Sequence, residues 1–284
     1  MDYHSIDFFD DEKIIAGYTT GGEGHWHDHT KEDWPHFTDL AETFGLKITD
    51  LIRTRQRHTD AILPVGKEDG GGGILRELGA KKRDVMLQKA VTQNDESKSG
   101  DFHIRLFDET SPENDLQAYD GLITTDAGLM LTIVTADCVP IFLYDPRNLA
   151  IGLVHSGREG CAKEIAARAV EKMQECYGTN SAELLCYLGP YLSAKHHEVQ
   201  EKDLEGFYKN FSESECKKII ASKNNGHYQI DMGQAIEATL TRAGVKPENI
   251  QDDHVCTFEH KELYSWRRDH DPDARILSFM MIAK

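Results

Sequence analysis

Residues Tyr119–Gly160 read YDGLITTDAGLMLTIVTADCVPIFLYDPRNLAIGLVHSGREG, and they set the expected architecture of the chain. Leu129–Thr135 and Val139–Tyr144 are apolar, β-rich runs with few charges, which is typical of buried strands. Asp145–Asn148 reads DPRN, and proline at the second position favours a type I turn. This turn predicts that Leu149–Val154 folds back on the preceding strand as a hairpin.

Two chemically active side chains stand at the ends of these runs. Cys138 follows Asp137 directly, and His155 comes seventeen positions after Cys138. Pro140 cannot donate a ladder hydrogen bond, so regular strand structure is interrupted near the cysteine. The hairpin predicts that the thiol and the imidazole meet at one sheet edge. His58, in Gln-Arg-His, is a third residue of the right type, but spacing alone does not tie it to the other two.

Two chemical interpretations of these residues compete. One cysteine and two histidines form an N₂S set, which suits Zn²⁺ and leaves a position open for water or substrate. Such a metal lowers the pKa of its water to about 7. Alternatively, Cys138 is a thiolate nucleophile and His155 its base, as in cysteine hydrolases. A true multicopper laccase is disfavoured by the residues, because Cys138 is flanked by Asp137 and Val139 rather than by histidines.

The rest of the chain alternates predicted strands and helices. Gly178 should end one of the helices, and Asp231 should cap another. The mixture predicts an α/β (α+β) fold, a sandwich with mixed sheets, formed by residues 1–284 as a single domain. Strands are expected at Ile14–Tyr18, Leu184–Leu188 and Ile276–Ile282, and helices at Phe37–Phe44, from about Cys161 to Cys176, and from Asp231 to about Ala243.

Residues 66–118 differ in character and are predicted to form a variable surface insertion or lid. Gly70–Gly73 is a glycine run typical of flexible segments. Leu75–Val91 has helical spacing, and Phe102–Phe107 alternates as an exposed strand does.

A histidine-rich segment, HWHDH, lies near the start of the chain. His25, His27 and His29 stand at alternate positions, so in an extended segment they would point the same way and offer a second metal site. The charged residues around them favour an exposed polar segment instead, and this second site is the weaker prediction.

The charge and the apolar content of the chain limit the kinds of binding partner that it can have. The formal net charge of −17 argues against nucleic acid or an anionic membrane as the main partner, since both need a positive footprint. The first residues have neither the basic nor the apolar part of a signal peptide, and no run approaches the roughly 18 apolar residues of a membrane span. A cytoplasmic location is therefore expected, with the six cysteines as free thiols or metal ligands.

Several motifs together resemble the polyphenol oxidase/laccase-domain family (YfiH/YlmD-like proteins), also described as multifunctional purine nucleoside phosphorylases. TADCVPIFLYD followed by AIGLVHSGREG resembles the signature of that family. RQRHTDAI, YDGLITT, LGPYLSAKHHEV and CTFEHKELYSWRRDHDPDARILSFMMI resemble its other conserved segments. The resemblance covers nearly the whole chain apart from about residues 66–118.

The resemblance implies a three-layer α/β/α sandwich with mixed sheets, and a metal held by His58, Cys138 and His155. The metal is commonly zinc, with copper as the alternative. The implied enzyme activity is phosphorolysis of adenosine, inosine, guanosine and methylthioadenosine, with adenosine deamination at the same site. Some members are described instead as copper-dependent phenol oxidases, which implies a phenolic substrate and O₂. A metal-free cysteine amidohydrolase, with Cys138 and His155 as catalytic groups, is a further alternative.

Other site residues follow from the same motifs. Asp137 is expected to shuttle a proton or, like Gln56, to orient a ligand. Arginine forks match phosphate oxygens, so the candidates to hold phosphate are Arg57, Arg158, Arg267 and Arg268. The chain departs from the family pattern at Arg158-Glu159, where tryptophan and arginine are usual, and at Thr59, where glycine is expected. The oligomeric state is left open between a monomer and a small homo-oligomer.

Overall fold

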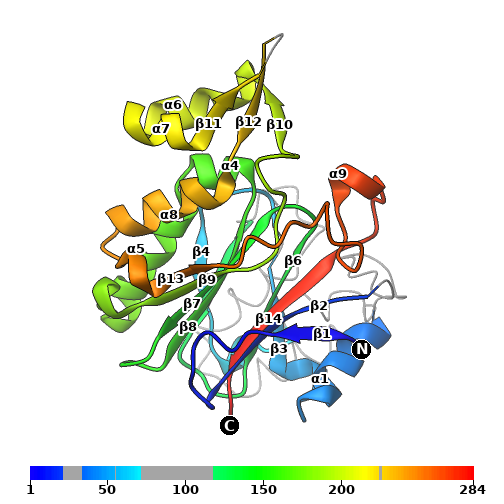
Figure 1. Ribbon diagram of the computed structural model, residues 1–284. Helices are drawn as coiled ribbons and strands as arrows, with labels where there is room; N and C mark the ends of the chain where they lie inside the picture. The colour runs from blue at the N-terminus through cyan, green and yellow to red at the C-terminus, as the bar shows by residue number, and fades with distance from the viewer. Residues whose placement is uncertain (22–33, 55, 72–117, 224–225) are drawn as a thin grey trace, which may run out of the picture.

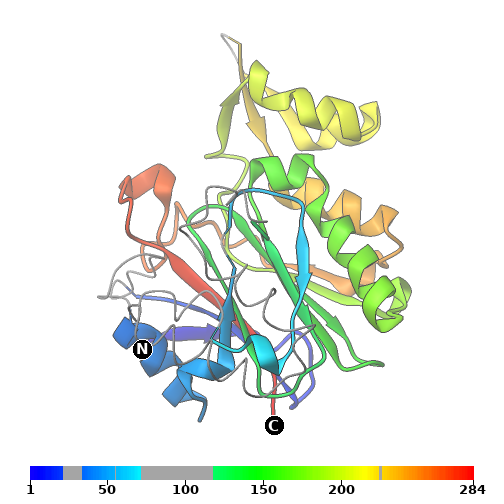
Figure 2. The same cartoon turned by 180° about the vertical axis from the view of Figure 1, so that it is seen from behind.

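The computed structural model describes residues 1–21, 34–54, 56–71, 118–223 and 226–284. It has a mixed α/β architecture built around two large β-sheets (Figures 1 and 2). Most of the predicted insertion, including Leu75–Val91 and Phe102–Phe107, lies outside the described residues. So do His25, His27 and His29. Among the described helices, none combines the length and apolar character needed to cross a membrane.

The first large sheet has six strands in the order β13-β9-β7-β8-β5-β4. At its centre, the predicted hairpin is confirmed: β7 runs antiparallel to β8, with Val139 opposite Ser156 and Asp145 opposite Ala150. Asp145 holds the turn by accepting hydrogen bonds from the backbone N–H groups of Arg147 and Asn148. The strands are β4 (Ile62–Pro64), β5 (Gly121–Thr124), β7 (Val139–Asp145), β8 (Ala150–Ser156), β9 (Leu185–Leu188) and β13 (Ile250–Asp252).

The second large sheet has five strands in the order β1-β2-β14-β6-β3. The last strand of the chain, β14, occupies its centre and pairs antiparallel with both β2 and β6. Its predicted bounds, Ile276–Ile282, are confirmed, and all seven residues are buried. The other strands are β1 (Tyr3–Ser5), β2 (Ile14–Thr19), β3 (Leu51–Arg53) and β6 (Met130–Thr135).

The two large sheets pack face to face, so the β layer of the sandwich is double. Ile133 and Met280 of one sheet share a buried apolar cluster with Phe142 and Tyr144 of the other. Helices cover both outer faces: α1 (Trp34–Thr43) packs on the five-stranded sheet, and α5 (Ile165–Tyr177) and α8 (Met232–Arg242) pack on the six-stranded sheet. The predicted mixed α/β sandwich is thereby confirmed, with helices on either side of the sheets (Figure 1).

The helix predicted from Cys161 to Cys176 is not continuous. It is divided into α4 (Arg158–Ala162) and α5, and Glu164 between them has a left-handed backbone with φ of 61°. The break lets α5 lay its apolar stripe along the sheet while α4 turns its first residues toward the end of β8. The predicted ends are confirmed, because Gly178 caps α5 with φ of 68° and the Asp231 side chain accepts the N–H of Gln234 at the start of α8.

A smaller unit projects beyond the two large sheets (Figure 1). It contains a three-stranded sheet of order β10-β12-β11 with two short helices beside it. Phe207, Phe211 and Ile219 anchor it to the same apolar cluster as α5 and α8. Its elements are β10 (Glu198–Gln200), α6 (Glu205–Asn210), α7 (Glu213–Ile219), β11 (Ile220–Ser222) and β12 (His227–Ile230); the short α9 (Trp266–Asp269) lies elsewhere, just before β14.

Candidate metal centre and substrate pocket

The structure brings His58, Cys138 and His155 together. One ligand atom from each lies within 4.8 Å of those of the other two. Cys138 Sγ is 3.8 Å from His58 Nε2, and the rings of His58 and His155 have centroids 5.0 Å apart. Cys138 stands just before β7 and His155 lies in β8, opposite Pro140. His58, which spacing could not place, comes from the segment between β3 and β4.

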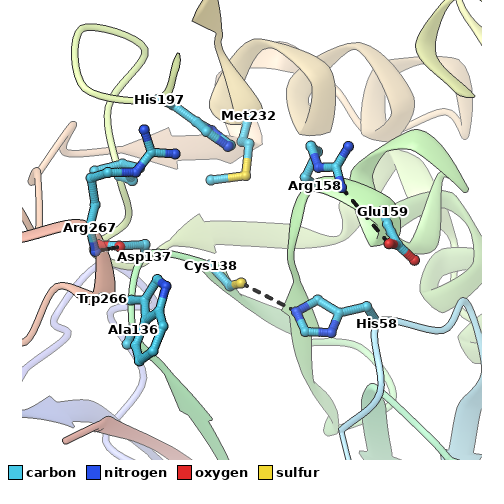
Figure 3. Close-up of a pocket in the computed structure, with 11 residues that line it drawn as sticks. His58, Ala136, Asp137, Cys138, Arg158, Glu159, His197, Met232, Trp266 and Arg267 are labelled. Carbon is cyan, nitrogen blue, oxygen red and sulfur yellow. Dashed lines mark hydrogen bonds and ion pairs between the residues drawn. The ribbon is translucent and has the colours of Figure 1, made fainter. Parts of the chain in front are cut away.

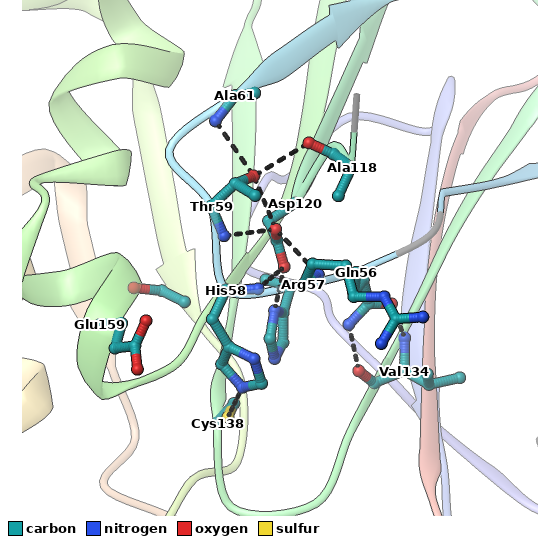
Figure 4. Close-up of polar contacts among 12 residues, drawn as sticks. Gln56, Arg57, His58, Thr59, Ala61, Ala118, Asp120, Val134, Cys138 and Glu159 are labelled. Carbon is teal, nitrogen blue, oxygen red and sulfur yellow. Dashed lines mark hydrogen bonds and ion pairs between the residues drawn. The ribbon is translucent and has the colours of Figure 1, made fainter. Parts of the chain in front are cut away.

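Asp120, directly before β5, fixes the His58 segment. Its carboxylate accepts the backbone N–H groups of Arg57 at 3.1 Å, His58 at 3.0 Å and Thr59 at 2.7 Å, and the Thr59 hydroxyl at 2.7 Å (Figure 4). Lys163 Nζ donates to the carbonyl of His58 at 2.9 Å. These contacts hold His58 in a left-handed backbone, with φ of 58°, that few non-glycine residues adopt. The imidazole is thus positioned by its backbone.

The same carboxylate orients His155. Asp120 Oδ1 lies 2.7 Å from His155 Nδ1, so the Nε2 edge of that ring is left for Cys138 or a metal. Burial raises the pKa of Asp120, but the hydrogen bond and charge of His155 outweigh it and lower the value to about 2. One carboxylate therefore sets the position of two of the three candidate ligands.

Cys138 and His155 stabilise each other's charged forms. Burial alone would raise the pKa of the Cys138 thiol, but the charge and hydrogen bonds of His155 and His58 lower it to about 6. Burial likewise opposes the charge on His155, whereas Cys138 and Asp120 raise its pKa to about 9. Without a metal, the pair is accordingly a thiolate beside an imidazolium.

The donor set and the space around it fit a metal ion. A thiolate with two imidazoles is a zinc-type donor set. Gly157 lies against the same cluster, and a Cβ atom there would be 2.6 Å from His58 Cδ2 and 2.9 Å from Cys138 Sγ. Only a residue without a side chain leaves room for His58 and Cys138 to stay in place.

The cluster opens into a cavity of about 350 Å³. This volume lies in the range of small-molecule sites, about 300–1,000 Å³. His58 and Cys138 lie on one side, and Arg158, His197 and Arg267 lie on the other (Figure 3). The lining residues are His58, Ala136, Asp137, Cys138, Arg158, Glu159, Leu192, His197, Met232, Trp266 and Arg267.

Three basic side chains form one wall, the cationic wall, defined as Arg158, His197 and Arg267. Arg158 is anchored by Asp203 at 2.6 Å, and Arg267 Nη2 donates to the carbonyl of Glu198 at 3.1 Å. His197 is 8% exposed, and its Nδ1 is buried without a hydrogen-bond partner. Burial, and then the charges of the two arginines, lower the pKa of His197 to about 4. His197 is therefore a neutral ring between two guanidinium groups.

The other predicted site residues are engaged elsewhere. Asp137 lines the cavity, yet one carboxylate oxygen accepts the Thr257 hydroxyl at 2.6 Å and the other the N–H of Arg267 at 2.7 Å. Gln56 pairs with both backbone groups of Val134. Neither Arg57 nor Arg268 lines this cavity.

Arg268 instead binds four backbone carbonyls, from Thr257, Phe258, His260 and Leu263, and the carboxylate of Asp269. It holds the segment before β14 in place. The guanidinium group of Arg268 is therefore used to position this segment and is not available to bind phosphate.

Sequence reasoning missed several residues of the site. His197 stands in the LGPYLSAKHHEV motif with no pattern that marks it as a site residue, and its neighbour in the chain, His196, belongs to a different cluster. Trp266, Met232 and Leu192 come from segments far apart in sequence, and no periodicity links them to Cys138. Asp120 stands in the YDGLITT motif, where its position just before a strand was the only available signal.

The chain was compared with known proteins. The family described as multi-copper polyphenol oxidoreductase laccase matches residues 23–283. A purine nucleoside phosphorylase from Bacteroides thetaiotaomicron is 33% identical over 60% of this chain, and the match spans 63% of that relative's length, less than two thirds. Purine nucleoside phosphorylase YlmD of Bacillus subtilis is 26% identical over 95% of this chain and 88% of its own.

Two further comparisons bear on activity and fold. Adenosine deaminase RL5, from an unknown prokaryotic organism, is 31% identical over 59% of this chain and 64% of its own. The crystal structure of the hypothetical protein YfiH from Bacillus licheniformis superposes with a TM-score of 0.79 at 22% identity, covering 99% of this chain and 96% of that one. This likeness shows that the two share a fold.

Proposed function

The chain belongs to the multi-copper polyphenol oxidoreductase laccase family, and we propose that it is a zinc-dependent purine nucleoside phosphorylase that also deaminates adenosine. One observation carries the proposal: a His-Cys-His donor set opens into a cavity whose opposite wall is cationic. The relatives named purine nucleoside phosphorylase and adenosine deaminase support the same reaction classes. We expect the protein to act in the cytoplasm on small-molecule substrates.

We assign the metal to His58, Cys138 and His155. A bound zinc ion supplies Lewis acidity and lowers the pKa of a coordinated water. Asp120 keeps the two imidazoles oriented, because it holds the His58 backbone and His155 Nδ1 at once. Gln56 fastens the same segment to the end of β6. These residues act on the ligands rather than on the substrate.

We assign the phosphate or other anionic group to the cationic wall. Arginine presents several N–H donors in a fixed fork that matches phosphate oxygens. His197 adds a neutral donor: leaving an N–H buried without a partner costs more than leaving a bare acceptor nitrogen, so the proton belongs on Nε2, away from the buried Nδ1. An anion there would lie across the cavity from Cys138.

The remaining lining residues suit a purine. Trp266 offers an aromatic face at the rim, where it is 49% exposed, and Met232 and Leu192 offer apolar contact. Glu159 lines the cavity close to Arg158 and can accept an N–H of the base or take up a proton at its carboxylate oxygen. Asp137 is less suited to proton transfer than to positioning, because both of its oxygens already accept hydrogen bonds.

Two other activities have specific support. The family description favours a copper-dependent polyphenol oxidase at the same three ligands. The low pKa of Cys138, caused mainly by His155 once burial is overcome, favours a metal-free cysteine amidohydrolase. The three activities differ in what they require: phosphate or water with zinc, O₂ with copper, or no metal.

Metal analysis combined with three assays tests the proposal. Purified protein is expected to retain zinc, to release purine base from adenosine or inosine only when phosphate is present, and to form inosine from adenosine. His58→Ala and Cys138→Ser should lose the activities and the metal of this site together. Full activity after chelation would contradict the zinc proposal in favour of the amidohydrolase. Copper retention with O₂-dependent phenol turnover would contradict it in favour of the oxidase.

A further inference from the structure

We propose that His196, Cys256 and Glu259 form a second, structural site for a divalent metal of the zinc class. One ligand atom from each lies within 4.8 Å of those of the other two, and His196 Nε2 is 2.9 Å from Glu259 Oε1. Imidazole nitrogen, thiolate sulfur and carboxylate oxygen are all zinc ligands, and three protein ligands leave a fourth position for water. This cluster shares no residue with the first site.

The donors are already oriented toward one another. The ring of His196 stacks on Phe258, with centroids 4.2 Å apart and planes 16° from parallel, so its rotation is restricted. Cys256 is 3% exposed and is a free thiol. Its sulfur accepts the backbone N–H of Ser193 at 3.4 Å, which fixes the position of the sulfur beside His196 and Glu259. Little rearrangement is therefore needed to receive an ion.

Lys195 is the competing cation. Its Nζ lies 2.6 Å from the Glu259 oxygen that also faces His196. The lysine side chain is 74% exposed, and an ion pair so open to solvent contributes little because water screens it. A metal ion can displace the ammonium into solvent at low cost, and the carboxylate then keeps a positive partner. In the absence of metal, Lys195 fills that role.

The location of the second site indicates a structural role, which is to link two segments next to the cavity. It joins the segment after β9, which carries His197, to the segment before α9, whose Thr257 hydroxyl binds Asp137 at 2.6 Å. The same two segments are already linked by the N–H of Thr257 and the carbonyl of Tyr191. A metal here would fasten the cationic wall from behind without contacting the substrate cavity.

Zinc counting on the full chain tests this inference independently of the activity. After equilibration with zinc and removal of loosely bound ions, wild-type protein should hold two zinc ions per chain. Cys256→Ser and His196→Ala should each hold one, while His260→Ala, which changes a histidine of the same loop outside the cluster, should still hold two. Cys138→Ser should lose the ion of the His58/Cys138/His155 site and keep the ion of the second site. Failure of this second-site inference is therefore distinguishable from failure of the proposed function.

A variant that should gain affinity guards against simple misfolding. Lys195→Ala removes the competing ammonium, so the second zinc ion should bind more tightly, by up to about fivefold. Two results would overturn the inference: Cys256→Ser holding as much zinc as wild type, or Lys195→Ala leaving the affinity of every zinc ion unchanged. A cobalt–thiolate absorption band retained in Cys138→Ser and lost in the double variant with Cys256→Ser would support it.

Discussion

Gly157 occupies the point where the His58 segment and Cys138 come closest to the end of β8. Its φ of −82° is open to any residue, so the requirement for glycine here is one of space. In Gly157→Ala, the added Cβ would press on His58 Cδ2 and Cys138 Sγ. Displacing these groups is expected to lower zinc affinity by about 10- to 100-fold, as measured by competition with a zinc chelator.

Gly160→Ala is the matched control, three residues further along the same helix. Its added Cβ would meet its nearest neighbour, Ile165 Cγ2, at 3.4 Å, an ordinary contact. This variant should keep both zinc and activity. Equal zinc affinity in Gly157→Ala and wild type would contradict the assignment of His58 and Cys138 as ligands, because the added Cβ presses on both side chains.

A substitution at His197 is expected to impair phosphate binding without affecting the other functions of the site. In His197→Phe, an aromatic ring is kept and the donor is lost, so KM for phosphate should rise by about tenfold or more. Adenosine deamination needs no phosphate and should change little. Because Nδ1 is buried without a partner, the thermal midpoint should not fall. A matching loss of both activities would instead assign His197 a general structural role.

At the scale of elements, Asp120 ties β5 to the His58 segment and to β8. Asp120→Asn leaves His155 and several N–H donors without their carboxylate, and breaking a buried charged pair costs about 3–5 kcal/mol. We expect a fall of that order in the free energy of unfolding, measured by urea denaturation, together with loss of bound zinc. The two effects share one cause, because the same carboxylate holds two ligands.

Asp145→Asn provides the comparison, at the turn of the β7–β8 hairpin, which is the end of β8 opposite to His155. Asp145 is 1% exposed and accepts three local hydrogen bonds in the turn, two from backbone N–H groups and one from the Asn148 amide. This variant should also lose stability, yet it should bind zinc like wild type. Zinc loss in both variants would mean that the metal responds to overall stability rather than to Asp120.

Gly178 ends α5 in a left-handed conformation, with open space around it: a Cβ there would meet nothing within 4 Å. The cost of Gly178→Ala is therefore backbone strain alone, about 1–2 kcal/mol of unfolding free energy. Gly178→Asn should cost less, since asparagine tolerates this conformation better. Enzyme activity at fixed temperature should be unaffected in both, which a parallel denaturation and activity measurement would check.

At the scale of the whole molecule, the sequence predicted those features that depend on residues close together in the chain. The DPRN turn, the apolar runs beside it and the cap residues Asp231 and Gly178 predicted the central hairpin and two helix ends. The left-handed break at Glu164 was missed, because a charged residue in a helical pattern carries no sign of it. Convergence of His58 with Cys138 depends on Asp120, a long-range contact that only the motif resemblance anticipated. The short strands of the β10-β12-β11 sheet were missed for want of clear alternation.

The reactivity of individual cysteines toward an alkylating reagent indicates whether the metal site is occupied. In metal-free protein, Cys138 has a pKa of about 6 and is half-buried, so at pH 7 it is mostly thiolate. Burial raises the pKa of Cys161 to about 12, which makes that thiol inert. Alkylation at pH 7 after chelation should therefore modify Cys138 rapidly, with a rate that levels off above about pH 7. The exposed Cys176 serves as the internal reference for reagent activity.

Restoring zinc should reverse this reactivity, because a thiolate bound to a metal is no longer a free nucleophile. Mass spectrometry of the alkylated chain would then show Cys138 protected and Cys176 still modified. Recovery of phosphorolysis should follow the protection of Cys138 as zinc is added, since one ion accounts for both. If Cys138 were alkylated at the same rate with and without zinc while activity returned, the activating ion would have to lie at ligands other than Cys138.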